Sequence, residues 1–375
     1  MYKFKEYHIL FVVGFLALVL TGQDLFSQNE YYLDPEINQE NREPMRASYF
    51  VFENKSLAET NNWKDSKNYL NLNGEWDFKW YESPGELPKN FYTLNFDDSS
   101  WNTFEIPANW EVNGYGIPIY VNATYEFQNL IDINPPKVPV DYNPTGVYRR
   151  TIEIDQNWDQ KDVFLHVGAA KSNLKVWVNG EYVGYGEDAK LPQEFNITPF
   201  IKTGKNLIVM KVMRWSDGSY LEGQDYWRMS GITRDTYLFA RKKVRLQDFE
   251  VKTELDEHYQ DAILTIIPEF SDLPKRDKHR LEIILEKKND KLYQAEKRVS
   301  EWQESSEIKI DVENPDKWTA ETPNLYTLKF TLKDKKGKVQ EIIHQNLGFR
   351  EIQIKDGQLL ATKMSNETKT ESIFK

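Results

Sequence analysis

Residues 174–183 read LKVWVNGEYV, and this stretch decides the fold class of the chain. Apolar and polar side chains alternate on both sides of Asn179 and Gly180, which is the period of a half-buried β-strand. An Asn-Gly pair between two such runs favours a two-residue turn, because both turn positions require a positive φ. The stretch therefore predicts a β-hairpin.

The same pattern extends outward from this hairpin. Residues 72–80 alternate from Trp76 onward, and residues 163–167 form a short apolar run. No long segment shows a helical period, so we expect an all-β protein. Short strands with long loops over such a length favour a jelly-roll sandwich, which we place at residues 48–242.

A second β-unit begins near Val244. Its candidate strands are residues 249–253, 262–268, 281–286, 308–312, 325–332 and 339–347. Six short strands at this spacing predict an immunoglobulin-like sandwich at residues 243–350. The charged stretches 287–290 and 333–337 are expected to be hairpin tips, and nothing in this unit indicates chemistry.

The N-terminus has the order of an export signal. Lys3 and Lys5 precede an apolar core at residues 9–20, which is short for a membrane span, and polar residues follow. We therefore expect residues 1–27 to be a signal peptide and the protein to be exported. An uncleaved membrane anchor is the alternative. Residues 28–47 are polar and irregular and are expected to form an extended arm.

Composition narrows the classes of function. The chain has 375 residues and a formal net charge of −11, which argues against nucleic acid as a partner. It has no cysteine, so thiol catalysis, Cys-based zinc sites and disulfides are excluded. Its five histidines are scattered without metal-binding spacing. Aromatic residues make up 14% of the chain, which suits β-structure and surfaces that contact sugars.

Residues 213–235, MRWSDGSYLEGQDYWRMSGITRD, combine aromatic and acidic side chains in an irregular segment after an apolar run at 207–210. A strand that opens into such a loop is typical of carbohydrate sites, where aromatic faces meet C–H groups and carboxylates or amides bind hydroxyls. Trp215, Tyr226 and Trp227 are equally suited to a hydrophobic core. Composition alone does not decide between these interpretations.

Two polar residues are candidate ligands for a sugar. Asn122 lies between tyrosines in PIYVNATY at residues 118–125, and Asp217 lies in RWSDGSYLE at residues 214–222. Both types of side chain bind sugar hydroxyls, and Asp217 also suits a hard cation. Asn and Asp are also frequent turn residues, and that role is favoured by the residues alone. Glu222 and Asp225 are an improbable acid pair, because a loop on a β-sandwich is an unusual place for one.

These residues belong to a longer series of motifs. The series is LNGEW (72–76), PANW (107–110), PIYVNATY, NPTGVY (143–148), VGYGED (183–188), RWSDGSYLE, DYWRMSGI (225–232), ENP (313–315), WT (318–319), PNLY (323–326) and GFR (348–350). In these motifs and their order, the chain resembles the N-terminal part of the large bacterial β-galactosidases of glycoside hydrolase family 2. The resemblance covers about residues 57–360.

The resemblance implies a jelly roll followed by an immunoglobulin-like domain, and terminal β-D-galactosides as substrates. It matches Asn122 and Asp217 to positions that reach into the galactose pocket, and it gives Asp217 a further role in a sodium site. Magnesium is expected only on the family's catalytic barrel. Periplasmic or extracellular localisation follows for an exported bacterial protein of this type.

The sequence departs from the family after GQLL at residues 357–360. The family continues into a (β/α)₈ barrel of roughly 200 residues or more, which carries the two glutamates of a retaining mechanism. Here the pattern breaks near Ala361, and we expect residues 351–375 to be a truncated, off-pattern tail. The chain is therefore expected to hold no catalytic residue, to require no cofactor, and to be inactive alone.

The expected partners are galactosides, bound weakly, and the missing barrel or full-length subunits. Nucleic acid is not expected as a partner, nor is a membrane after signal cleavage. Two alternatives to an inactive fragment without a function of its own stay open. One is a stand-alone module that binds galactosides weakly, and the other is an assembly module that docks through the face normally turned to the barrel.

Overall fold

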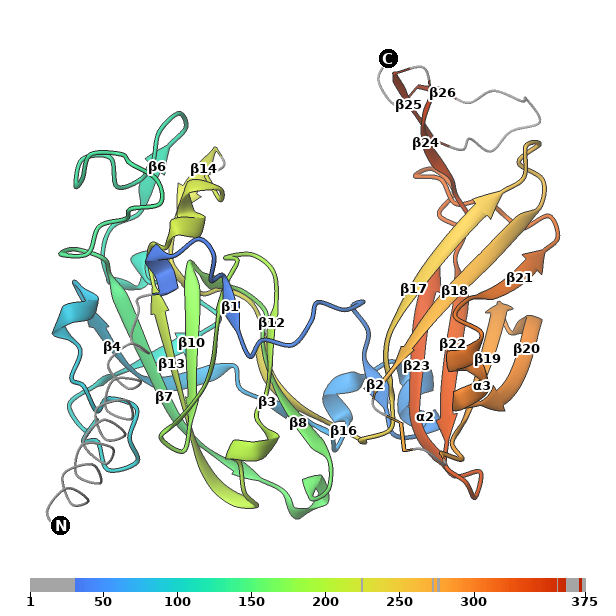
Figure 1. Ribbon diagram of the computed structural model, residues 1–375, viewed down its shortest axis with the longest axis horizontal. Coiled ribbons are helices and arrows are strands. Elements are labelled where there is room, and N and C mark those ends of the chain that lie inside the picture. Colours follow the sequence, from blue (N-terminus) through green and yellow to red (C-terminus); the bar gives the residue numbers. More distant parts are fainter. Residues whose placement is uncertain are drawn as a thin grey trace, which may run out of the picture.

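The computed structural model describes residues 31–223, 225–271, 273–274, 277–355, 357–361 and 371–372. Two β-sandwiches lie side by side within them (Figure 1). The expected signal peptide at residues 1–27 lies outside the described residues. In the part of the chain that is described, no helix is long and apolar enough to cross a bilayer.

The first sandwich contains two antiparallel sheets, as an all-β jelly roll requires. The larger sheet has the order β1 (Gln39–Glu40), β11 (Glu181–Glu187), β10 (Asn173–Val178), β13 (Gly204–Met213), β7 (Thr145–Ile154), β4 (Gly74–Tyr81) and β5 (Asn102–Ile106). The smaller sheet has the order β12 (Gln193–Asn196), β8 (Asp162–Val167), β16 (Thr236–Arg241) and β3 (Tyr69–Asn71). The prediction of a jelly roll is thus confirmed.

The predicted alternation and hairpin are both present. In β4, Trp76 and Phe78 are buried in the core between the sheets, while Glu75 and Asp77 are exposed. The turn between β10 and β11 consists of Asn179 and Gly180, with φ values of 53° and 88°. Both positions are left-handed, which explains why the Asn-Gly pair was a reliable signal.

The second sandwich also packs two sheets. One contains β17 (Leu246–Leu255), β18 (Ala262–Phe270) and β21 (Ile308–Val312). The other has the order β2 (Val51–Phe52), β23 (Val339–Leu347), β22 (Tyr326–Lys333), β19 (Arg280–Lys287) and β20 (Asp290–Arg298). The helix α3 (Val299–Glu304) closes this core, with the Trp302 indole nitrogen donating to the Leu281 carbonyl at 2.9 Å. The expected immunoglobulin-like architecture is confirmed.

Strand β20 was not among the expected strands. It is an edge strand whose residues are mostly exposed, so it lacks the apolar alternation by which strands are recognised. Its pairing with β19 depends instead on backbone register and on charged pairs such as Arg280 with Glu296, whose Nε–Oε1 distance is 2.5 Å.

The expected start of the jelly roll at residue 48 needs correction. Strand β2 pairs with β23 of the second sandwich, and the following helix α2 (Lys55–Thr60) also lies against β23. Phe52 is buried there with Ala58 and Ile342. The segment with β2 and α2 therefore belongs to the second sandwich, although it precedes the first sandwich in sequence. Its apolar cluster excludes water by packing against β23.

The C-terminal part contains β24 (Ile352–Lys355), β25 (Gln358–Ala361) and β26 (Glu371–Ser372). They form a three-stranded sheet at the far end of the second sandwich (Figure 1). The expected off-pattern tail at residues 351–375 thus contains these three short strands. Its remainder, residues 362–370 and 373–375, lies outside the described residues.

Short elements connect these strands. They are η1 (Tyr31–Leu33), η2 (Trp63–Asp65), η3 (Pro84–Glu86), η4 (Glu111–Asn113), β6 (Ile119–Val121), η5 (Gln156–Trp158), β9 (Ala170–Lys171), η6 (Thr198–Phe200), η7 (Asp217–Tyr220), β14 (Tyr226–Arg228) and β15 (Gly231–Ile232). Strands β6 and β14 pair as a two-stranded ribbon that projects from one end of the first sandwich (Figure 1). This end carries both predicted site residues.

Candidate functional site

The loop after β13 is fixed by backbone hydrogen bonds at the point where the strand ends. The side-chain amide of Asn143 donates to the Trp215 carbonyl and accepts from the Trp215 amide, both at 3.0 Å. The Arg214 amide donates to the Pro144 carbonyl at 2.8 Å. Asn143 and Pro144 of the motif NPTGVY thus hold the first residues of RWSDGSYLE in place.

A buried ion network holds the neighbouring loops. Arg214 lies 3.3 Å from Glu126 and 3.4 Å from Glu111, and Lys171 lies 2.8 Å from the other oxygen of Glu126. Burial raises the pKa of the Glu126 carboxyl, but Lys171 and Arg214 outweigh burial, so the pKa is lowered overall. Arg214 also donates to the Ile117 and Arg228 carbonyls, both at 3.1 Å. The β6–β14 ribbon is therefore anchored on one arginine.

Asp217 begins η7 and is only 8% exposed. Its Oδ1 accepts from the Gly218 amide at 2.7 Å, while Oδ2 is buried without a hydrogen bond from an N–H or hydroxyl group of the described residues. Glu187, at the end of β11, lies against this turn, because its Oε2 would be 2.9 Å from a Cβ atom placed on Gly218. Burial, together with the nearby Asp217 carboxyl, raises the pKa of Glu187 to about 8. Sequence reasoning did not single out Glu187.

Asn122 lies in a different environment. It follows β6 directly and is exposed at the tip of the ribbon. The segments that contain Asn122 and Asp217 approach each other nearby, since Thr124, Tyr125, Ser219 and Glu222 line one small cavity. The structure thus brings the two loops to the same end of the sandwich, with Asn122 facing solvent and Asp217 turned inward.

The cavity between these loops has a volume of about 10 Å³. Sites that enclose a small ligand have roughly 300 Å³ or more, so this one does not enclose a sugar. Glu222 and Asp225 both make hydrogen bonds that shape the loops. Glu222 accepts from the Ala189 amide at 2.6 Å, and Asp225 accepts from the Tyr120 hydroxyl at 2.5 Å. Neither arrangement points to an acid–base pair.

The three aromatics of the loop have different roles. Trp215 is 1% exposed and packs with Phe127 in a small core, so the core interpretation is correct for this residue. Trp227 is 54% exposed, and its cross-strand neighbour Tyr120 is 51% exposed, with 5.6 Å between their ring centroids. Tyr226 is partly buried. The ribbon therefore presents two accessible aromatic faces.

Asp217, among the described residues, is the predicted ligand for a sodium ion. Among the described residues, no three or more His, Cys, Asp or Glu side chains are grouped so as to hold a metal. Asp217 offers a hard oxygen in Oδ2, which suits such an ion, but further ligands are needed to complete its coordination. The described residues do not by themselves form a metal centre.

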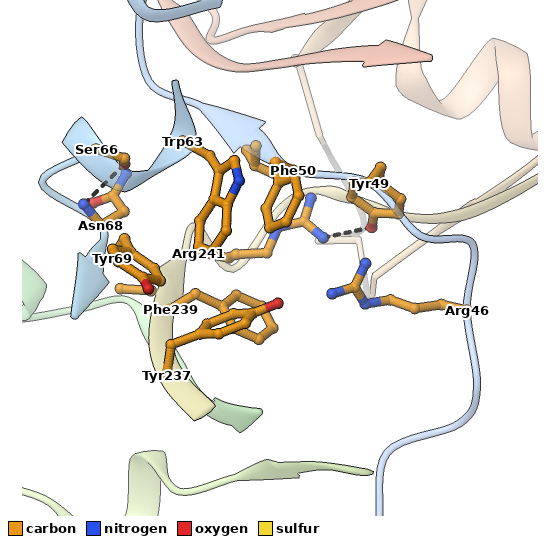
Figure 2. A pocket seen from close by; sticks show the side chains of 12 residues that line it. Arg46, Tyr49, Phe50, Trp63, Ser66, Asn68, Tyr69, Tyr237, Phe239 and Arg241 are labelled. Carbon is orange, nitrogen blue, oxygen red and sulfur yellow. Dashed lines mark hydrogen bonds between the residues drawn. The ribbon is translucent and has the colours of Figure 1, made fainter. Parts of the chain in front are cut away.

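Two cavities larger than the 10 Å³ one lie beside the arm that precedes β2. Figure 2 shows a pocket of about 40 Å³ between the sandwiches, where Phe50 stacks on Trp63 and Arg241 donates to Tyr49. An adjoining cleft of about 670 Å³ runs between residues 43–50 and the outer face of the smaller sheet. No sequence motif had indicated either cavity.

Comparison with known proteins identifies the family. The sequence model described as "Glycosyl hydrolases family 2, sugar binding domain" matches residues 69–242, and "Glycosyl hydrolases family 2" matches residues 244–350. A β-galactosidase of Priestia megaterium is 37% identical over 335 residues, which are 88% of this chain and 32% of that protein. The chain therefore spans about a third of the curated relative.

Solved structures show the same fold. Bacteroides uniformis β-glucuronidase 2 superposes with a TM-score of 0.61 at 23% identity, covering 78% of this chain and 34% of that one. A β-glycosidase from Bacteroides vulgatus gives a TM-score of 0.58 at 23% identity, covering 76% and 34%. The motifs, the two sandwiches and the family matches lead to one conclusion: the chain belongs to glycosyl hydrolase family 2 and comprises its N-terminal sugar-binding and immunoglobulin-like domains.

Proposed function

We propose that this chain forms the non-catalytic, sugar-contacting part of a β-galactosidase that hydrolyses terminal non-reducing β-D-galactose residues. The observation that carries the proposal is the 37% identity to a β-galactosidase over 88% of the chain. The β-glucuronidase structures are 23% identical or less and support the fold only. The two glutamates of a retaining mechanism belong to a catalytic domain, so the chain alone is expected to be inactive.

In this proposal Asn122 and Asp217 contact galactoside hydroxyls, and Asp217 adds one ligand to a sodium ion. The exposure of Asn122 supports its role. Asp217 Oδ2 is buried, and it has no hydrogen-bond partner among the described residues, so one acceptor is left for a ligand. The 10 Å³ cavity between their loops means that a second surface must complete the pocket. Binding by the isolated chain is therefore expected to be weak, in the millimolar range or above.

A second candidate function is assembly, and exposed apolar side chains at the same end favour it. Tyr120 and Trp227 on the ribbon are joined by Val112, Ile117 and Leu221, all of them exposed by half or more. Apolar side chains gathered at one end of a protein commonly mark a protein interface. Docking of a catalytic domain or of full-length subunits there would bury them.

The deciding experiment compares the purified chain with a version extended by the downstream reading frame, on chromogenic β-galactoside and β-glucuronide substrates. We expect galactosidase activity in the extended form only. Activity of the 375-residue chain that survives further purification would overturn the assignment of catalysis to another domain. Activity on the glucuronide alone would overturn the choice of substrate.

Sedimentation separates the two candidate functions. A monomer that still binds a galactoside supports the binding role, whereas self-association that the substitution Trp227→Ala abolishes supports assembly.

We also propose export, on the basis of the charged and apolar residues 1–20. N-terminal sequencing of protein expressed in a bacterial host tests it, and an intact Met1 in the cytoplasmic fraction would contradict it.

A further inference from the structure

An open cleft of about 670 Å³ lies between the N-terminal arm and the outer face of the smaller sheet. Its floor is a row of cross-strand neighbours: Glu194 on β12, His166 on β8 and Tyr237 on β16. Its opposite wall is the arm at residues 43–50. Sites that bind small ligands have volumes of roughly 300–1,000 Å³, so this cleft has room for one, unlike the 10 Å³ cavity beside η7.

The arm is fixed to both sandwiches, so the cleft is formed before any ligand arrives. Arg46 binds Glu194 of the first sandwich through two hydrogen bonds, at 2.7 and 2.9 Å. The Tyr49 hydroxyl donates to the Gln247 carbonyl of the second sandwich at 2.6 Å. Figure 2 shows Arg46 and Tyr49 beside Phe50, which lines the same cleft. A ligand that enters a formed site does not have to order the protein, which favours binding.

The side chains that stay accessible in the cleft are of two kinds. Met45, Phe50 and Leu191 are apolar and are exposed by 47%, 37% and 47%. Arg234 and Asp235 are exposed charged residues of opposite sign, and Arg234 makes no hydrogen bond or ion pair in the part of the chain that the structure describes. A charged ligand would be repelled by one member of this pair. A neutral ligand whose hydroxyls both donate and accept hydrogen bonds suits both.

The backbone around the cleft argues against a peptide strand as the ligand. A peptide that extends a sheet needs an open strand edge. Strand β8 lies between β12 and β16, and the arm already occupies the outer edge of β12. There the Glu43 amide donates to the Glu194 carbonyl at 2.8 Å, and Arg42 forms a β-bridge with Phe195. The cleft therefore offers side chains rather than a free edge, and apolar side chains beside hydrogen-bonding groups match the C–H faces and hydroxyls of a sugar.

We propose that this cleft is a second carbohydrate site, which binds a neutral oligosaccharide and takes no part in catalysis. Its volume is more than twice the lower limit for ligand sites, so it has room for more than one sugar unit. It is separate from the proposed galactoside contacts, because Asn122 and Asp217 follow β6 and β13 rather than the strands of the smaller sheet. The inference does not depend on those contacts.

Calorimetric titration of the 375-residue chain with three neutral β-1,4-linked tetrasaccharides, galactotetraose, xylotetraose and cellotetraose, tests the proposal. We expect binding of at least one of them, weakened about tenfold in Arg234→Ala, which removes a charged hydrogen-bond donor, and also weakened in Phe50→Ala. Lys205→Ala, which removes an exposed cation at the start of β13, is the matched control and should bind like the unmodified chain. Circular dichroism establishes that each variant is folded.

Two results would overturn the proposal directly: binding of none of the three tetrasaccharides, or equal binding in Arg234→Ala, Phe50→Ala and the unmodified chain. Self-association that Arg234→Ala and Phe50→Ala abolish would also overturn it, because the cleft would then receive a second copy of the chain. Asn122→Ala separates the two sugar sites. We expect it to keep tetrasaccharide binding and to lose methyl β-D-galactoside, whereas Arg234→Ala should do the reverse. Loss of the tetrasaccharide in Asn122→Ala would place that ligand at the galactoside end and refute the second site.

Discussion

Glu194 offers the sharpest test of how the N-terminal arm is attached. It lies on β12, and Arg46 of the arm binds it through two hydrogen bonds, Nη2 to Oε1 at 2.7 Å and Nε to Oε2 at 2.9 Å. His166 Nδ1 lies 2.9 Å from Oε1. Burial by itself would raise the pKa of Glu194, but the His166 hydrogen bond and the Arg46 charge outweigh burial and lower the pKa from 4.5 to about 2.

The perturbation is Glu194→Gln. A carboxyl whose pKa is lower in the folded state stabilises the fold above its unfolded pKa, and this contribution is lost as the pH falls through the folded pKa. A shift from 4.5 to about 2 corresponds to about 3 kcal/mol of unfolding free energy. We therefore expect Glu194→Gln to cost about 3 kcal/mol at pH 7, with a difference from the unmodified chain that shrinks between pH 4.5 and 2.

Urea unfolding followed by tryptophan fluorescence, repeated from pH 7 down to pH 2.5, measures this difference. Glu36→Gln, an exposed substitution in the same arm, is the control and is expected to change little. A Glu194→Gln protein as stable as the unmodified chain at pH 7 would refute the reasoning. So would a difference that persists undiminished at pH 2.5, because the ion pair would then not be its source.

Three further predictions concern a buried ion pair, a tightly packed glycine and the exposed Asn122. Glu341→Ala leaves the Arg241 charge without its partner at 2.6 Å and should destabilise the chain by about 3–5 kcal/mol in urea unfolding, with part of the loss restored by adding Arg241→Met. Gly146→Ala places a methyl group against the Trp110 ring and should cost about 1–3 kcal/mol or more, whereas Gly85→Ala, which meets only Ser83 Oγ at 3.7 Å, should be nearly neutral in thermal melts. Asn122→Ala should alter stability by less than about 0.5 kcal/mol yet weaken galactoside binding by NMR; unchanged binding would remove Asn122 from the site.

Local sequence predicted the elements whose signal is contained in a few neighbouring residues. The β10–β11 hairpin follows from Asn179 and Gly180, which adopt the positive φ values that their turn requires. The alternation around Trp76 and Phe78 identified a strand with one face in the core. Strand β20 escaped prediction because its mostly exposed side chains leave no such alternation.

The sequence predicts which residues form the candidate site but not how they are arranged. Motifs singled out Asn122 and Asp217, and they lie on neighbouring loops. Asp217 is buried at the start of η7, and Glu187, which is distant in sequence, lies against η7 from the end of β11. No local pattern around either residue contains that contact.

The sequence by itself determined the β-class of this protein, the order of its two sandwiches and the family to which it belongs, because turn chemistry, apolar periodicity and motifs are properties of short segments. Only the tertiary structure decided that β2 joins the second sandwich and that Glu187 lies against η7. These outcomes depend on which segments, distant in sequence, pack together to exclude water and on which buried polar groups pair with one another. Both depend on the packing of the whole chain.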